Sequence, residues 1–222
     1  MTGAPLVLIA HGSTDPRFDD VVQAVAARVR ELRPQLEVRV GYLEHGPPNV
    51  ADVAGGGVLV PLLLASGFHV LKDLPEQAPG ALASPAVGPD ERVAVALRDR
   101  LAEAGYDGTS PVVLAAAGSS DERALDDVRT AARQLAELLA VEVTPAFISA
   151  GSPRVVDAIA ATPGAAVASY LVAPGAFHDA VIATGAAVVS APIGDHPAVA
   201  DVVLSRYDEC GSGQPPGRTA PT

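Results

Sequence analysis

The second half of this 222-residue chain repeats the first half. In each half an apolar segment ends in Gly-Ser, followed by an aspartate and a stretch with helical spacing of apolar residues. Two further segments recur in the same order and at a nearly constant offset. The matched pairs are 7–15 with 112–121, 41–48 with 146–153, and 62–69 with 171–178. Three segments in register are hard to obtain by chance, so the sequence predicts a duplicated unit.

The elements within each repeat alternate between strand and helix. Residues 6–10 and 57–64 form continuous apolar runs, which are typical of strands buried on both faces. Residues 15–33 carry valines at steps of three and four, and Pro34 stops this helix. Alternating strands and helices favour a parallel sheet. We therefore predict an α/β fold with two duplicated, doubly wound parallel-sheet lobes and a cleft between them.

The predicted boundaries follow the repeat. Residues 105–111 form the linker, so we expect an N-terminal lobe at 1–107 that carries the active site and a degenerate C-terminal lobe at 108–209. The Gly- and Pro-rich end, 210–222, is predicted to be a disordered tail. Residues 78–89 are rich in Pro, Gly, Ala and Ser, and we expect a mobile loop that acts as a lid over the cleft.

Composition excludes several classes of partner. The formal net charge is −11 and no basic cluster is present, which argues against binding to nucleic acid or to an anionic membrane surface. No uninterrupted apolar run is long enough to span a bilayer, and the N-terminus does not resemble a signal peptide. A single cysteine, Cys210, excludes an internal disulfide and a Cys-rich metal centre. We expect a cytoplasmic protein.

Three residues stand at or just after the carboxyl ends of predicted strands in the first repeat: His11, Glu44 and His69. In open parallel sheets these ends form the crevice where ligands bind. The second repeat keeps the flanking glycines and serines but has Ala117 and Ser149 in place of the first two residues. Because the fold tolerates these replacements, His11 and Glu44 are better explained by chemistry than by structure.

Two imidazoles and one carboxylate suit a borderline divalent metal ion such as Fe²⁺, Co²⁺, Ni²⁺ or Zn²⁺. Three protein ligands leave coordination positions open, as in metal delivery or catalysis, whereas structural zinc sites are closed by four ligands. We therefore predict that His11, Glu44 and His69 bind a metal and act in catalysis. His69 is less secure than the other two, because its counterpart in the second repeat is also a histidine, His178.

Simpler roles remain open for each residue. His11 could hydrogen-bond to the backbone of its own turn, Glu44 could cap the helix that follows it, and His69 could pack as a loop histidine. We expect His45 to point away from Glu44 as a surface or supporting residue, and His196 to lie at a helix start. His178 could face the same cleft or serve structure alone.

The motifs Ala-His-Gly-Ser at 10–13, Tyr-Leu-Glu at 42–44 and Gly-Phe-His at 67–69, followed by Lys-Asp-Leu-Pro at 72–75, resemble those of the class II chelatases that act on sirohydrochlorin. The resemblance extends from about residue 6 to residue 207 and matches the long, two-lobed form of that family. It implies ATP-independent insertion of Fe²⁺ or Co²⁺ into sirohydrochlorin, toward sirohaem or cobalamin. In that family the residues that match His11, Glu44 and His69 bind the metal or accept pyrrole protons.

Because the second repeat lacks the first His and the Glu of this pattern, we expect one active site per chain. We expect no cofactor beyond the substrate metal, and a monomer with a pseudo-dimeric fold, since two fused lobes can bury the interface internally. Sirohydrochlorin carries many carboxylates, and the nearest cations to meet them are Arg17, Arg39 and Lys72. Two alternatives stay open: a metal or tetrapyrrole carrier without turnover, and a small hydrolase with His11 as nucleophile.

Overall fold

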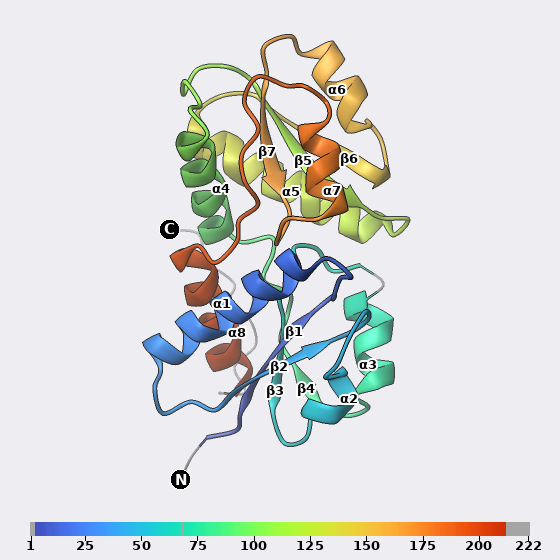
Figure 1. The fold of residues 1–222 in the computed structure, drawn as a ribbon, viewed down its shortest axis with the longest axis vertical. Coiled ribbons are helices and arrows are strands. Elements are labelled where there is room, and N and C mark those ends of the chain that lie inside the picture. The colour runs from blue at the N-terminus through green and yellow to red at the C-terminus, as the bar shows by residue number, and fades with distance from the viewer. Residues whose placement is uncertain (1–2, 68, 212–222) are drawn as a thin grey trace, which may run out of the picture.

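The computed structural model of the protein describes residues 3–67 and 69–211. Its first lobe is built on a four-stranded parallel sheet in the order β2-β1-β3-β4 (Figure 1). Its strands are β1 (Leu6–Ala10), β2 (Val38–Tyr42), β3 (Val58–Pro61) and β4 (Leu82–Ala83). All residues of the central strand β1 are buried, as its continuous apolar run predicts.

The second lobe repeats this plan with a three-stranded parallel sheet in the order β6-β5-β7. Its strands are β5 (Val112–Gly118), β6 (Val143–Ala150) and β7 (Ala166–Tyr170). The first two strands of each lobe pair at matching positions of the repeat, since Ala10 of β1 pairs with Tyr42 of β2 and Ala116 of β5 pairs with Phe147 of β6. The predicted α/β fold with two parallel-sheet lobes is confirmed.

Each lobe has one long helix directly after its central strand. These helices are α1 (Pro16–Leu32) and α5 (Glu122–Leu139). Asp15 and Asp121 are their N-caps, and each side chain accepts a hydrogen bond from the backbone N–H two residues on. The shorter helices are α2 (Val50–Val53), the π-helix η1 (His69–Asp73), α3 (Leu74–Gln77), α6 (Val155–Ala161) and α7 (Ala176–Ile182).

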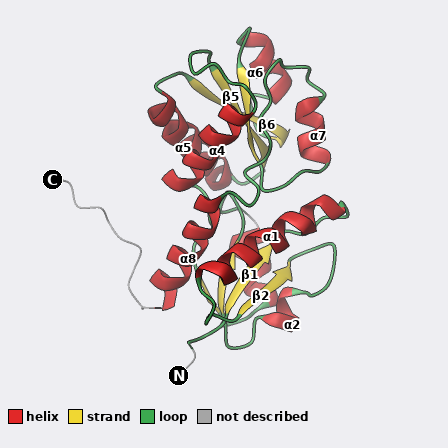
Figure 2. Cartoon of the chain, turned by 60° about the vertical axis from the view of Figure 1, so that its left-hand side comes forward, coloured by secondary structure: helices red, strands yellow, loops and turns green. Residues whose placement is uncertain are grey.

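The last helix of each repeat packs on the other lobe. Helix α4 (Glu91–Glu103) lies against α5 and β7 of the second lobe, and α8 (Pro197–Gly211) lies against α1 and β3 of the first (Figures 1 and 2). The boundaries at 107 and 209 follow the sequence repeat and stay predictions. In space, the two lobes exchange helices, and one core cluster contains residues of both sheets.

The segment 78–89 is no lid, and this prediction is wrong. Its residues Leu82 and Ala83 form β4, which pairs with β3, and Val87 donates a backbone hydrogen bond to Pro61. Ala86 and Val87 are buried, 2% and 0% exposed. The Pro- and Gly-rich composition reflects a tight path along the sheet edge, where the backbone is held by hydrogen bonds.

The predicted tail at 210–222 begins too early, because α8 continues through Cys210 to Gly211. The remainder, 212–222, lies outside the described residues. His196 directly precedes α8, so its prediction as a helix-start residue is confirmed; its ring also contacts Asp99 of α4 at 3.1 Å. Within the described parts of the chain, no helix is long and apolar enough to span a membrane.

Candidate active site

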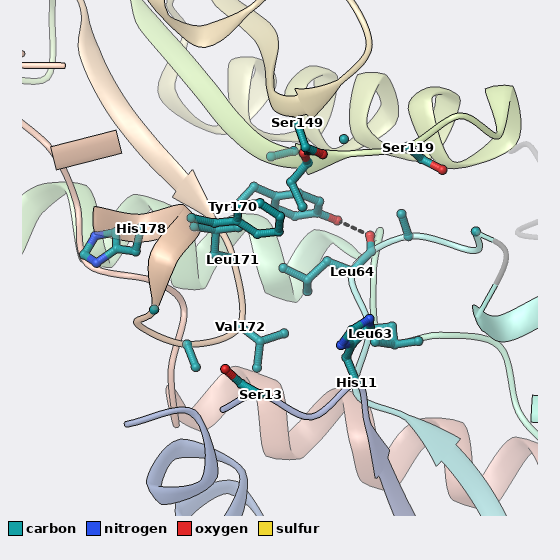
Figure 3. A pocket seen from close by; sticks show the side chains of 18 of the residues that line it. His11, Ser13, Leu63, Leu64, Ser119, Ser149, Tyr170, Leu171, Val172 and His178 are labelled. Atoms are coloured by element: carbon teal, nitrogen blue, oxygen red, sulfur yellow. Dashed lines mark hydrogen bonds between the residues drawn. The ribbon is translucent and has the colours of Figure 1, made fainter. Parts of the chain in front are cut away.

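A pocket of about 770 Å³ lies between the lobes, at the carboxyl ends of both sheets (Figure 3). Its size falls within the range of small-molecule sites, about 300–1,000 Å³. The first lobe contributes the turns after β1, β2 and β3, and the second lobe contributes the matching turns. Ligands of parallel sheets bind at the carboxyl ends of the strands. Here the carboxyl ends of the two sheets face each other, and the pocket lies between them.

His11 is the first residue after β1 and lines this pocket. Its Nδ1 lies 3.0 Å from the carbonyl oxygen of Gly12. A carbonyl oxygen only accepts hydrogen bonds, so this contact is made by the tautomer with hydrogen on Nδ1. In the neutral ring the lone pair is then on Nε2, the arrangement found in metal-binding histidines whose other nitrogen donates to a carbonyl. The backbone contact expected as an alternative is thus present and compatible with metal binding.

Glu44 is held beside His11 by the backbone. Its N–H donates to the carbonyl oxygen of His11 at 2.8 Å, which joins the turn after β2 to the turn after β1. Gly12 makes this approach possible, since a Cβ there would stand 1.9 Å from the Glu44 carbonyl oxygen. Glu44 does not cap the following helix, because Asn49 is the N-cap of α2. Glu44 is not one of the residues described as lining the pocket; its carboxylate lies beside the pocket, 3.3 Å from the Nε2 of His45, which does line it.

His45 does not point away from Glu44, and that prediction is wrong. The His45 Nε2 lies 3.3 Å from the Glu44 carboxylate, and the ring centre lies 6.1 Å from that of His11. The reason is local: His45 has a φ of 57°, which places consecutive side chains on one side instead of on opposite faces. Unlike Glu44, His45 is itself a lining residue of the pocket.

The backbone of His69 begins η1, directly after the turn that follows β3, but its side chain lies outside what the structure describes. Its convergence with His11 and Glu44 therefore stays a prediction. Among the side chains that the structure does describe, no group of three or more His, Cys, Asp or Glu residues is placed to hold a metal ion.

The second lobe presents a different chemistry to the pocket. Ala117 stands at the position of His11, and the Ser149 hydroxyl, at the position of Glu44, donates to the Ala117 carbonyl oxygen at 2.6 Å. His178 also lines the pocket, but its Nε2 donates to the Ser190 carbonyl oxygen at 3.1 Å within the same lobe (Figure 3). His178 thus faces the cleft while a structural hydrogen bond holds its ring.

The pocket walls are mainly apolar. Leu63 and Leu64 approach from the first lobe, and Leu171 and Val172 approach from the second (Figure 3). The Tyr170 hydroxyl donates to the Leu64 carbonyl oxygen at 2.7 Å, a buried hydrogen bond between lobes that fixes their separation. Burial raises the pKa of Tyr170, so this hydroxyl remains a donor throughout the physiological range.

None of the residues described as lining the pocket is a lysine or arginine. Arg17 is the nearest of the three predicted cations, and it bridges Asp15 of its own lobe and Asp179 of the other. Hydrogen bonds from the Arg17 side chain lower the pKa of Asp15. Arg39 contacts Glu37 and the carbonyl oxygen of Gly55, away from the pocket. Lys72 is exposed on η1 and is not a lining residue.

The sequence reasoning missed two pocket residues. Tyr170 lies in an apolar strand, where the residues alone give no indication that its hydroxyl crosses between lobes. The sequence predicts His45 as a surface or supporting residue that points away from Glu44, because neighbouring side chains alternate along an extended chain. The Gly-Pro-Pro that follows His45 indicates a turn at this point. In a turn, neighbouring side chains need not point to opposite sides of the chain.

Comparison with known proteins places this fold and site in context. The CbiX family model matches the chain twice, at residues 5–104 and 111–210. A sirohydrochlorin cobaltochelatase of Methanococcoides burtonii is 37% identical over 79 residues, which cover 32% of this chain and 60% of the relative. One of Sulfurisphaera tokodaii is 31% identical over 112 residues, covering 44% of this chain and 91% of the relative. The chain thus spans about 60% of the length of the first of these relatives.

Solved structures agree along most of the chain. A CbiX described as the terminal enzyme for biosynthesis of siroheme in denitrifying bacteria has a TM-score of 0.72 and 26% identity, covering 90% of this chain and 98% of the other. SirB from Bacillus subtilis with Fe³⁺ has a TM-score of 0.73 and 23% identity, covering 94% and 96%, which supports the fold. With the family model matching both repeats over nearly the whole chain, the chain belongs to the CbiX family.

Proposed function

We propose that this protein inserts a divalent metal ion, Fe²⁺ or Co²⁺, into sirohydrochlorin without ATP. The observation that carries the proposal is the apolar pocket between the lobes, with His11 and His45 on one side of it and Glu44 at its edge. A flat macrocycle suits apolar walls, and the polar cluster on one side suits delivery of an ion to one face of the ring. The activities named for the relatives, cobaltochelatase and ferrochelatase, support the same substrate.

Insertion requires that two pyrrole N–H protons leave while a metal reaches four ring nitrogens. We assign these tasks to His11, Glu44 and His69. A neutral imidazole can bind the metal or accept a proton, and a carboxylate can do either as well. The Nδ1 contact of His11 with the Gly12 carbonyl presents Nε2 as the basic nitrogen of the neutral ring. The metal is substrate here, and we propose no further cofactor.

One active site per chain follows from the difference between the lobes. The second-lobe positions that match His11 and Glu44 carry a methyl group and a hydroxyl that donates to its own turn. The second lobe would therefore serve as a wall that holds the macrocycle. Its serines, Ser119 and Ser120, supply hydroxyl groups that can meet substrate carboxylates without a lysine or arginine in the lining. We also propose that the chain works as a monomer, since both lobes are supplied by one chain.

The test is Co²⁺ insertion into sirohydrochlorin by purified protein, followed by the change in the tetrapyrrole absorption spectrum. We expect His11→Ala to lower the insertion rate by about 100-fold or more, the range that loss of a proton-accepting group produces. His196→Gln is the matched control, because it removes an imidazole outside the pocket while the amide can still donate to Asp99. An unchanged rate in His11→Ala would overturn the assignment.

The same assay separates a catalyst from a carrier. With sirohydrochlorin in large excess over protein, an enzyme converts many equivalents, whereas a carrier stops after one equivalent. Parallel reactions with Fe²⁺ and Co²⁺ then show which ion the protein inserts faster, and with it the assignment to sirohaem or cobalamin synthesis. A wild-type protein that inserts neither ion contradicts the proposed function.

A further inference from the structure

The backbone at His45 is unusual. His45 has a left-handed φ of 57°, a conformation that residues with side chains seldom adopt. The matched residue of the second lobe, Ala150, is the last residue of strand β6 and keeps strand backbone. The turn also meets its neighbour differently in the two lobes: strands β5 and β6 shift register between Ala116 and Gly118, so Gly118 faces Ala150, whereas Gly12 faces Glu44. The departure in the first lobe coincides with the change from alanine to histidine.

The left-handed backbone brings the His45 ring to the two residues that the second lobe lacks. Its Nε2 lies 3.3 Å from the Glu44 Oε2, and its ring centre lies 6.1 Å from that of His11. The His45 and Glu44 side chains are about half exposed, 47% and 46%. The pair therefore stands at the rim of the pocket, where a hydrated ion arriving from solvent meets it first.

These separations suit the coordination of one ion. Metal bonds of about 2.0–2.2 Å to imidazole nitrogen and carboxylate oxygen set two tetrahedral ligand atoms ~3.3 Å apart. With the same bond lengths and a tetrahedral angle, two imidazole rings on one ion have their centres about 5 Å apart, so the His11 and His45 rings must approach by about 1 Å to share an ion. A carboxylate and imidazoles are also the ligands that borderline divalent ions accept.

We propose that His45 is a ligand of the substrate metal, and that Glu44 and His45 form a capture site which receives the hydrated ion and passes it to His11. The transfer of the ion toward insertion rests on the proposed function. The capture site itself rests on the structure alone. Two protein ligands leave the other positions to water, so the ion stays exchangeable. Passage to His11 needs only side-chain rotation, because the two ring centres lie 6.1 Å apart, about 1 Å more than in a shared tetrahedral site.

The experiment measures Co²⁺ binding to the protein without tetrapyrrole, by calorimetric titration and by the visible spectrum of bound Co²⁺. The informative variant is His45→Asn, because asparagine tolerates the left-handed φ while it removes the imidazole. We expect the Co²⁺ dissociation constant to rise at least tenfold and the spectrum to change. His196→Gln, outside the pocket, is the control and should bind as the wild type does.

Insertion kinetics provide a second readout. A capture ligand acts before chemistry, so His45→Asn should raise the KM for Co²⁺ more than it lowers kcat, which a purely structural role would not do. Unchanged Co²⁺ affinity in His45→Asn, or a wild-type protein that binds no Co²⁺, overturns the capture site. Binding that depends on His45 in a protein without insertion activity would instead overturn the proposed function and leave the site standing.

Discussion

At the scale of single residues, Gly12 determines whether the turn after β1 can meet the turn after β2. It has a φ of 93°, and a Cβ on it would stand 1.9 Å from the carbonyl oxygen of Glu44. Gly118 repeats this arrangement in the second lobe, with a φ of 92° and a distance of 2.0 Å to the Ala150 carbonyl oxygen. A side chain at either glycine must separate the turn from its neighbour, because the clash is with backbone.

We therefore predict that Gly12→Ala lowers the free energy of unfolding by about 2–4 kcal/mol, through strain at positive φ and backbone displacement. It should also reduce metal insertion, since Glu44 moves with its turn. Gly118→Ala should cost similar stability with a smaller effect on activity. Urea denaturation gives the free energies, and Gly55→Ala, where a Cβ meets nothing within 4 Å, is the control. Equal stability of Gly12→Ala and Gly55→Ala would contradict the prediction.

At the scale of elements, the start of α4 joins the two halves of the chain. Asp90 is the N-cap of α4; its carboxylate accepts hydrogen bonds from the backbone and side chain of Arg92 and from Arg206 of α8. The side chain is 12% exposed. Burial by itself would raise the pKa of Asp90, but the hydrogen bonds and the charges of the two arginines outweigh it, and the pKa is lowered.

A carboxylate whose folded pKa lies below its unfolded value of about 3.9 stabilises the fold above that pH. This contribution is lost as the pH falls through the folded pKa. We predict that Asp90→Asn lowers the free energy of unfolding by about 1–3 kcal/mol at pH 7. The difference from wild type should shrink in acid, as measured by urea denaturation between pH 7 and pH 3. Asp157→Asn, on the exposed face of α6, is the control; a difference that is independent of pH would exclude the linkage.

At the scale of the whole molecule, the exchange of α4 and α8 makes each lobe depend on the other. Neither half of the sequence holds the complete set of helices that covers its own sheet, and one core cluster runs through both. The buried hydrogen bond from Tyr170 to Leu64 adds a fixed point between them. This rigidity suits the flat macrocycle that we propose as the substrate, because the two walls of the pocket then keep a fixed width.

We predict that the protein unfolds in a single transition despite its two sheets. In differential scanning calorimetry the calorimetric and van't Hoff enthalpies should agree, which is the test of two-state unfolding. A fragment of residues 1–107 should fail to fold cooperatively, because its α4 loses the surface of α5 and β7. Two resolved transitions in the full chain, or a stably folded fragment, would show that the lobes are independent.

The sequence by itself determined the duplicated α/β plan, the strand-end positions of His11 and Glu44, and the replacement of both in the second repeat. These features are local or periodic, so they can be read along the chain, and the internal repeat supplied a comparison that a single sequence normally lacks. His69 stays a prediction, since only its backbone is described.

Only the tertiary structure decided where His45 points, which lobe α4 and α8 cover, and that 78–89 lies along a sheet edge. The direction of His45 depends on one φ angle, and a change of sign there reverses the expected alternation. The apolar face of a helix does not indicate which of the two sheets the helix will cover, because burial of apolar surface is not directional. The pocket of this CbiX-family protein is therefore set by contacts between distant segments, whereas the sequence already marks His11, Glu44 and His69, the residues that we propose for its chemistry.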